Sequence, residues 1–436
     1  MALPPTIADE ENNRNVIHFG SEEEESILPT VTELTKYADL IVRTAVHIAP
    51  GQTLWINAPI HVPELVRLVV KRAYEVGAKQ VHVAWRDEEV TKLHYSLAPD
   101  AAFEQYPAWR AQAMTDLAEA GDAYLLIHSE DPELLKGVDP GRIANYSRIS
   151  SAALSTFRSY MSSKRMTWSI VAVPSEGWAR LVYPQLESNE AVETLWEAIL
   201  RIVRVDEDDP VAAWERHNNE LLAKRAYLDA KQYKQLHYRG PGTDLVIGLP
   251  ERHRWNGGIS WNEKGAAFNP NVPTEEVYTA PLRTGTNGFV RSTKPLSYQG
   301  KLIENFSLTF EQGRVVHFEA EKGYEVLMTM LGLDGQSRYL GEAALVPHHS
   351  PISNSGLIFF NTLFDENASN HLALGNAYPT CIEGGASMSR EELEQAGLNQ
   401  SILHVDFMIG SADMDIDGIT ADGVREPVFR KGNWAF

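Results

Sequence analysis

The first half of the chain alternates short apolar runs with longer amphipathic stretches, and this alternation constrains the fold more than any other feature. Four runs have the composition of buried strands, at residues 53–59, 80–85, 123–128 and 168–174. Helical periodicity marks the segments around them, at residues 31–46, 62–78, 103–120, 153–166, 191–205 and 211–233. Strands that are apolar along nearly their whole length need cover on both faces. The pattern therefore predicts an α/β domain with a parallel sheet and helices on both faces.

The turns after these strands argue against a nucleotide site. They begin at Asn57, Trp85 and His128, and none contains a G-x-G-x-x-G motif or a Walker lysine loop. We interpret this half as a scaffold that contributes substrate-side contacts.

Near His237 the pattern changes from alternating helices and strands to short strands. A chain of 436 residues is long enough for two domains. Short alternating strands follow, at 244–249, 288–295 and 307–321, the last with a hairpin turn at Gln312-Gly313. Helical segments are few there, at 324–331, 361–379 and 390–396. We predict an acidic, flexible N-terminal extension over 1–27, an α/β domain over 28–236, and an α+β, β-rich catalytic domain over 237–436.

Charge and cysteine content narrow the possible partners. The formal net charge of −20 disfavours nucleic acid and anionic membrane surfaces. A single cysteine, Cys381, excludes an internal disulfide and a thiolate zinc cluster, so a metal would need nitrogen and oxygen ligands. The N-terminus lacks a secretory signal pattern, and no window has membrane-spanning length. These features predict a cytoplasmic protein.

Two groups of acidic residues in the second half are unusually placed. Glu275 and Glu276 are adjacent, and neighbours on an extended segment point to opposite faces, so only one of them can enter a shared site. A solvated pair is the alternative. Glu342 stands in a strongly apolar run, where a buried carboxylate is costly unless it is paired or bound to a metal.

The stretch Asn361–Pro379 places His371 and Tyr378 seven residues apart. A helix beginning at Asp365 or Asn367 would put both side chains on one face, two turns apart. A hydrogen-bonded core histidine is the alternative. Further along, His404 and Asp406 alternate with apolar residues, so a strand would present both on one face. That arrangement suits a metal site, although a simple His–Asp hydrogen bond also satisfies it.

Other sequence features do not indicate a metal site. The run beginning Asp413-Met-Asp415 lacks the glutamate that an EF-hand requires at its twelfth position, where Val424 stands, and it alternates like a strand. The adjacent His348 and His349 diverge in direction, and no H-E-x-x-H motif occurs.

Taken together, six residues supply three carboxylates, two imidazoles and a phenol: Glu276, Glu342, His371, Tyr378, His404 and Asp406. Six ligands exceed one tetrahedral zinc. They suit two divalent ions roughly 3.5–4 Å apart that share a bridging carboxylate and a bridging water or hydroxide.

At these positions the sequence resembles a known family. The segments PTEEV, GEAALVP, SPISNSG, FFNTLFDENASNHLALG and HVDFMIGS are similar to those of the co-catalytic metallo-aminopeptidases typified by aminopeptidase T, aminopeptidase S and, most closely, PepS. The resemblance runs from about Leu28 to Phe436 and places the family's metal ligands on the same six residues. It implies two domains, a homodimer that encloses the active-site cavity, and a preference for arginine or aromatic N-terminal residues.

The resulting hypothesis is hydrolysis of the first peptide bond of peptides with a free N-terminus, by water or hydroxide activated by two divalent ions (Zn, Co or Mn). Glu275 and Tyr378 are the candidates for proton transfer. Activity should fall below about pH 6, because histidine must be neutral and carboxylates ionised to bind metal. A non-catalytic peptide- or metal-binding protein, and a hydrolase of another amide, are the competing interpretations.

Overall fold

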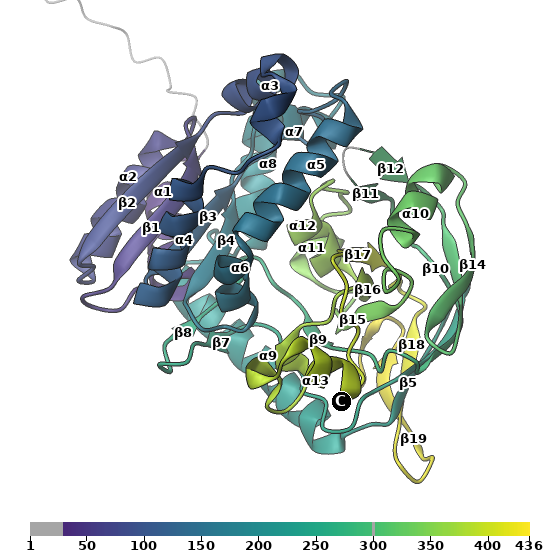
Figure 1. The fold of residues 1–436 in the computed structure, drawn as a ribbon. Helices are drawn as coiled ribbons and strands as arrows, with labels where there is room; N and C mark the ends of the chain where they lie inside the picture. The colour runs from purple at the N-terminus through teal and green to yellow at the C-terminus, as the bar shows by residue number, and fades with distance from the viewer. Residues whose placement is uncertain (1–28, 299–300) are drawn as a thin grey trace, which may run out of the picture.

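The computed structural model describes residues 29–298 and 301–436, so the predicted extension over 1–27 lies outside the described residues. Figure 1 shows a half rich in helices, coloured purple to teal, beside a half rich in strands, coloured green to yellow. Within the described residues, no helix is long and apolar enough to cross a membrane.

The first half contains a parallel sheet of four strands in the order β2-β1-β3-β4. Its strands are β1 (Thr53–Pro59), β2 (Gln80–Arg86), β3 (Ala123–His128) and β4 (Trp168–Ala172). All three strand pairs are parallel. The prediction of a parallel sheet with helices between its strands is therefore confirmed.

Different helices pack against the two faces of this sheet. Leu54 and Ile56 of β1 share a core with α1 (Val31–Leu40), α2 (Pro63–Glu75) and part of α8 (Ser188–Ile202). Trp55 and Tyr124, which alternate with those residues, pack with α4 (Ala108–Ala120) and α6 (Ser155–Ser162). The period-2 alternation of the strands thus directs side chains to both layers.

Three helices of this half lie in segments for which no helix was predicted. They are α3 (Glu88–Leu97), most of α5 (Pro140–Ala153) and α7 (Glu176–Val182). Neither α3 nor α5 has a fully buried residue. With little apolar surface to bury, these helices carry a weak periodic signal in the sequence.

The second half is largely antiparallel. An eight-stranded sheet has the order β14-β13-β10-β6-β5-β18-β19-β20. Its strands are β5 (Gln235–Gly240), β6 (Thr243–Gly248), β10 (Thr286–Arg291), β13 (Ser307–Glu311), β14 (Arg314–Glu319), β18 (Asp415–Ile419), β19 (Arg425–Arg430) and β20 (Asn433–Trp434). The predicted hairpin is present as β13 and β14, with Gln312 and Gly313 at positive φ in the turn. The rejected EF-hand segment leads into strand β18.

A second antiparallel sheet, in the order β17-β16-β15-β9, lies in the same half. It consists of β9 (Val277–Thr279), β15 (Leu340–Leu345), β16 (His371–Gly375) and β17 (His404–Met408). Two small pairs, β7 (Ser260–Trp261) with β8 (Ala267–Phe268) and β11 (Leu296–Tyr298) with β12 (Lys301–Ile303), complete the strands. The helices include α10 (Tyr324–Leu331), α11 (Pro351–Asn354) and α13 (Arg390–Gln395).

The helix predicted across Asn361–Pro379 is wrong. Helical structure covers only α12 (Thr362–Asp365) and the 3-10 turn η3 (Glu366–Ala368), and His371 begins strand β16. Asn361 caps α12, because its side chain accepts from the Leu363 N–H. The sequence HLALG pairs with both β15 and β17, and these long-range hydrogen bonds override the local helical spacing.

The two halves are joined by more than a linker. The long helix α9 (Pro210–Lys231) contributes Trp214 to the core of the first half and Leu228 to that of the second. Residues from beyond 237 return to the parallel sheet, where Ile170 of β4 bridges to Asn271 and Val272 joins its core. The boundary at 236/237 falls within strand β5 and stays a prediction.

Candidate metal centre

The sheet β17-β16-β15-β9 presents polar side chains on one face. Residues directly opposite each other in an antiparallel pair point to the same side. Glu342 is opposite Ala373, which is opposite Asp406. His371 and His404 each lie two positions before a member of this row, so strand alternation puts them on the same face. The sequence prediction that His404 and Asp406 share a strand face agrees with this arrangement.

Small residues leave room above this face. Ala373 lies between Glu342 and Asp406, and Gly375 is opposite His404. A Cβ at Gly375, whose φ is +104°, would lie 2.2 Å from the Leu403 carbonyl oxygen. A Cβ at Gly341, beside the bulge that precedes Glu342, would lie 2.1 Å from the Asn376 oxygen. These glycines allow the close backbone approach that sets the register of the acidic row.

The ligand atoms form two groups that share one carboxylate. His371 Nε2 lies 3.1 Å from Glu276 Oε2 and 3.5 Å from Glu342 Oε1. His404 Nε2 lies 3.9 Å from Glu342 Oε2 and 3.6 Å from Asp406 Oδ1. Within each group, Glu276–Glu342–His371 and Glu342–His404–Asp406, the ligand atoms lie within 4.8 Å of one another. Glu342 is thus placed to offer one oxygen to each group.

Both imidazoles have a fixed tautomer that suits metal binding. His371 Nδ1 lies 3.1 Å from the Ser369 carbonyl oxygen, and His404 Nδ1 lies 2.8 Å from that of Asn376. A carbonyl oxygen can only accept, so each Nδ1 donates, and each neutral ring keeps the Nε2 lone pair for the site.

The residues fit a divalent cation. His371 Nε2 and Asp406 Oδ1 are buried and have no hydrogen-bond partner among the described residues. The donors are nitrogen and carboxylate oxygen, which suit Zn, Co or Mn. Burial, together with the nearby carboxylates of Glu276 and Asp406, raises the pKa of Glu342 to about 7. A cation would offset this repulsion, because opposite charge favours the ionised carboxylate.

Tyr378, the sixth predicted ligand, lines the same pocket from the loop after β16. Its ring centroid lies 5.0 Å from that of His404 and 5.9 Å from that of Tyr278. Burial and the neighbouring carboxylates raise the pKa of Tyr378 well above its ordinary value. Without a cation beside it, this phenol keeps its proton and can donate a hydrogen bond.

Glu275 points elsewhere. Its carboxylate is buried and lies 2.8 Å from Arg204 Nη2 and 3.5 Å from His217 Nε2. Its backbone N–H donates to Asn367 Oδ1. As the extended segment predicts, Glu276 faces the metal centre and its neighbour faces away. The structure does not bring the side chain of Glu275 into the pocket.

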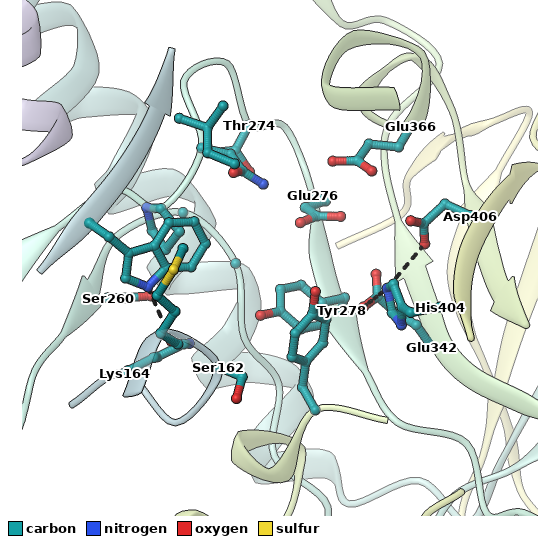
Figure 2. Close-up of a pocket in the computed structure, with 18 residues that line it drawn as sticks. Ser162, Lys164, Ser260, Thr274, Glu276, Tyr278, Glu342, Glu366, His404 and Asp406 are labelled. Carbon is teal, nitrogen blue, oxygen red and sulfur yellow. Dashed lines mark hydrogen bonds and ion pairs between the residues drawn. The ribbon is translucent and has the colours of Figure 1, made fainter. Parts of the chain in front are cut away.

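Sequence reasoning missed Glu366, which lines the pocket from η3. Figure 2 shows its carboxylate facing the space between Glu276 and Asp406. Burial raises the pKa of Glu366 well above its ordinary value, and Asp406 and Glu276 add to the shift. An acidic residue within the apolar 361–379 stretch is the available signal for Glu366 in the sequence.

The centre opens into a cavity of about 200 Å³ between the two halves. Figure 2 shows Glu342, Glu366, His404 and Asp406 on one side, with Ser162, Lys164 and Ser260 on the other. Ser162 and Lys164 come from the first half, so this half contributes to the lining of the cavity, while its predicted substrate-side contacts stay a prediction. His348 and His349 are not among the lining residues.

Comparisons with known proteins identify a family of metalloproteases. The sequence matches the family described as thermophilic metalloprotease (M29) over residues 30–434. It is 54% identical to Aminopeptidase 2 of Geobacillus stearothermophilus, covering 93% of this chain and 98% of that protein. Identity to Aminopeptidase PepS of Streptococcus thermophilus is 44%, covering 94% and 99%, so PepS is the less similar of the two. The structure resembles wild-type AmpT from Thermus thermophilus, with a TM-score of 0.87, 42% identity, and coverage of 93% and 99%.

Proposed function

The chain belongs to the M29 family of metalloproteases, and on that premise we propose that it is an aminopeptidase that uses two divalent ions to hydrolyse the first peptide bond of peptides. The observation that carries this proposal is the position of Glu342, which is shared by two groups of ligand atoms. One group alone would support a single ion. Two groups joined through one carboxylate are the arrangement of a co-catalytic pair.

In this proposal Glu276 and His371 would hold one ion, His404 and Asp406 would hold the other, and Glu342 would offer an oxygen to each. The ions, Zn, Co or Mn, would polarise the scissile carbonyl and lower the pKa of a water molecule toward neutrality. Tyr378 either completes the ligand set or donates its phenolic hydrogen to an oxygen atom of the substrate.

The carboxylates around the centre account for the restriction to N-terminal residues. Asp406, Glu366 and Glu276 concentrate negative charge at one side of the cavity. A substrate's free α-amino group would be held there, near one ion or a carboxylate that is not bound to an ion. An internal peptide bond has no free amino group to place at this position.

Glu366 is our preferred group for proton transfer. Its carboxyl faces the ligand cluster, and burial raises its pKa well above the ordinary value, which favours the protonated form that a general acid needs. Glu275, which the sequence suggests for this role, does not line the cavity, because its carboxylate pairs with Arg204 and His217. Tyr378 remains the second candidate, since it lines the cavity beside His404.

The remaining parts of the proposal rest on the family resemblance and on composition. They are a cytoplasmic homodimer, peptide substrates with a free N-terminus, and a preference for arginine or aromatic N-terminal residues. No nucleic acid or membrane partner is proposed, because the net charge of −20 repels both kinds of surface.

The test is metal-dependent turnover of aminoacyl-p-nitroanilides. Activity should disappear with EDTA and return with Zn, Co or Mn. Glu342→Gln and His404→Ala should each reduce kcat/KM by at least roughly 1,000-fold, because each removes a ligand of the reacting centre. Glu319→Gln, at an exposed position on β14, is the matched control. Full activity after rigorous metal removal, or retained turnover in both variants, would contradict the proposal.

A further inference from the structure

Lys164 occupies a special position on the wall of the cavity that faces the metal centre. It lies in the loop between α6 and β4, with a left-handed backbone (φ 56°). Its Nζ donates to Asn256 Oδ1 at 2.8 Å. Asn256 in turn exchanges backbone hydrogen bonds with Tyr278 on the edge strand of the metal-bearing sheet. The first half of the chain thereby places one ammonium group beside the catalytic sheet.

No carboxylate neutralises this ammonium group. Among the described residues, none lies within ion-pair distance of Lys164, although most buried charges in proteins are paired. Burial, with a contribution from Arg225, lowers the pKa of Lys164 to about 8. The side chain is still mostly protonated at neutral pH, so this wall carries a positive charge that no carboxylate contacts, although Glu276 acts on it at longer range.

The cavity is therefore polarised from one wall to the other. Lys164 is the single lysine or arginine among the described residues that line it, whereas four acidic residues line it: Glu276, Glu342, Glu366 and Asp406. Figure 2 shows the lysine on the side opposite Glu366 and Asp406. With two divalent ions among these carboxylates, Lys164 remains the ammonium group on the opposite wall, where opposite charge would stabilise a substrate carboxylate.

We propose that Lys164 is a specificity-determining residue that binds a substrate carboxylate on the leaving-group side of the scissile bond. The inference rests on the proposed aminopeptidase function. With the α-amino group at the acidic wall and the scissile bond at the metal centre, the rest of the peptide extends toward the opposite wall. Lys164 and the metal centre line the same cavity, and we assign the carboxylate that reaches Lys164 to the free C-terminus of a di- or tripeptide.

An acidic side chain after the scissile bond could also supply the carboxylate that binds Lys164. Three substrates distinguish this carboxylate from the free C-terminus. They are Leu-Leu, its C-terminal amide Leu-Leu-NH2, and Leu-Asp-NH2. The wild-type enzyme should favour Leu-Leu over Leu-Leu-NH2 by roughly 10- to 100-fold in kcat/KM, the range for one charge-assisted hydrogen bond. If Leu-Asp-NH2 is cleaved as well as Leu-Leu, the source is any carboxylate, and the assignment to the C-terminus is wrong.

Lys164→Gln keeps a donor for Asn256 but removes the charge, so it should abolish the preference for Leu-Leu. Its rate on Leu-Leu-NH2 and on leucine p-nitroanilide should stay within about threefold of wild type. Lys164→Arg should keep part of the preference, and Lys136→Gln, at an exposed lysine of the same half, is the matched control. Equal losses on the acid and the amide would show a structural role and overturn the proposal.

Failure of this inference is distinguishable from failure of the proposed function. Metal-dependent cleavage of leucine p-nitroanilide, which has no carboxylate, reports the aminopeptidase activity by itself. A wild-type enzyme that cleaves this substrate but does not discriminate Leu-Leu from its amide would refute only the role of Lys164.

Discussion

The two walls of the cavity are built differently. The metal-binding wall is the face of one antiparallel sheet, where strand register brings Glu342, Ala373 and Asp406 into one row. The opposite wall is assembled from segments between elements, with Lys164 in a loop of the other half. A sheet fixes neighbouring ligands through many backbone hydrogen bonds, which suits chemistry that tolerates little displacement. Loops tolerate substitution more readily, which suits selection among substrates.

The largest expected effect comes from a bulky side chain placed between the metal ligands of the sheet. Ala373→Leu adds three carbons between Glu342 and Asp406, where the ions are expected. We expect loss of bound metal and at least a 100-fold loss of kcat/KM, while the overpacking itself costs about 1–3 kcal/mol of stability. Metal analysis of the purified variant and circular dichroism check these outcomes.

Ala373→Ser is the matched control, because its small side chain leaves the row open. If the leucine variant binds metal and turns over substrate like wild type, the ions do not lie above this row.

A smaller effect tests whether the sheet alone positions the metal ligands or whether the first half of the chain contributes. Arg204 belongs to the first half, yet it contacts Glu275, the neighbour of Glu276. Arg204→Met leaves a buried carboxylate without its main partner. We expect a loss of roughly 3 kcal/mol in the free energy of unfolding and a reduced affinity for one of the two ions. Urea denaturation and metal titration measure both quantities.

Arg204→Lys should recover part of the stability, and Arg201→Met on exposed helix surface is the control. Unchanged stability in Arg204→Met would mean that the first half does not support the position of Glu276.

The smallest expected effect is the pH dependence of the substrate preference attributed to Lys164. The groups that act on Lys164 are Arg225, Cys381 and Glu276, and burial lowers the pKa of Lys164 to about 8. Below that pH the ammonium group is charged, and above it the charge is lost. The preference for Leu-Leu over Leu-Leu-NH2 should therefore decline as pH rises through about 8, by up to roughly tenfold per pH unit, toward the ratio shown by Lys164→Gln. The ratio of kcat/KM values across pH 6.5–9.5 measures this decline, and a ratio that does not change would contradict it.

Local patterns in the sequence predicted the parts of the site that depend on short-range geometry. The alternation in His404–Met408 predicted a strand with its two polar residues on one face, and the structure has strand β17 there. The adjacency of Glu275 and Glu276 predicted that they would diverge, as their different partners confirm. Four parallel strands followed from their apolar runs in the same way.

The rest depends on contacts between distant residues. The spacing of His371 and Tyr378 fitted a helix, but pairing with β15 and β17 makes the first a strand residue and the second a loop residue. Glu366 carries no periodic signal in its short 3-10 turn, and Lys164 lies in a loop. Their importance appears only when the fold brings them to opposite walls of one cavity.

The most direct test of the central claim is the number of metal ions bound per chain in wild type and in Glu342→Gln. Metal-free protein is titrated with Co, dialysed, and analysed for metal and protein content. If Glu342 joins the two groups of ligands, wild type should bind two ions per chain, and the variant should hold fewer than one. One ion in wild type, or one tightly held ion in Glu342→Gln, would contradict a shared carboxylate.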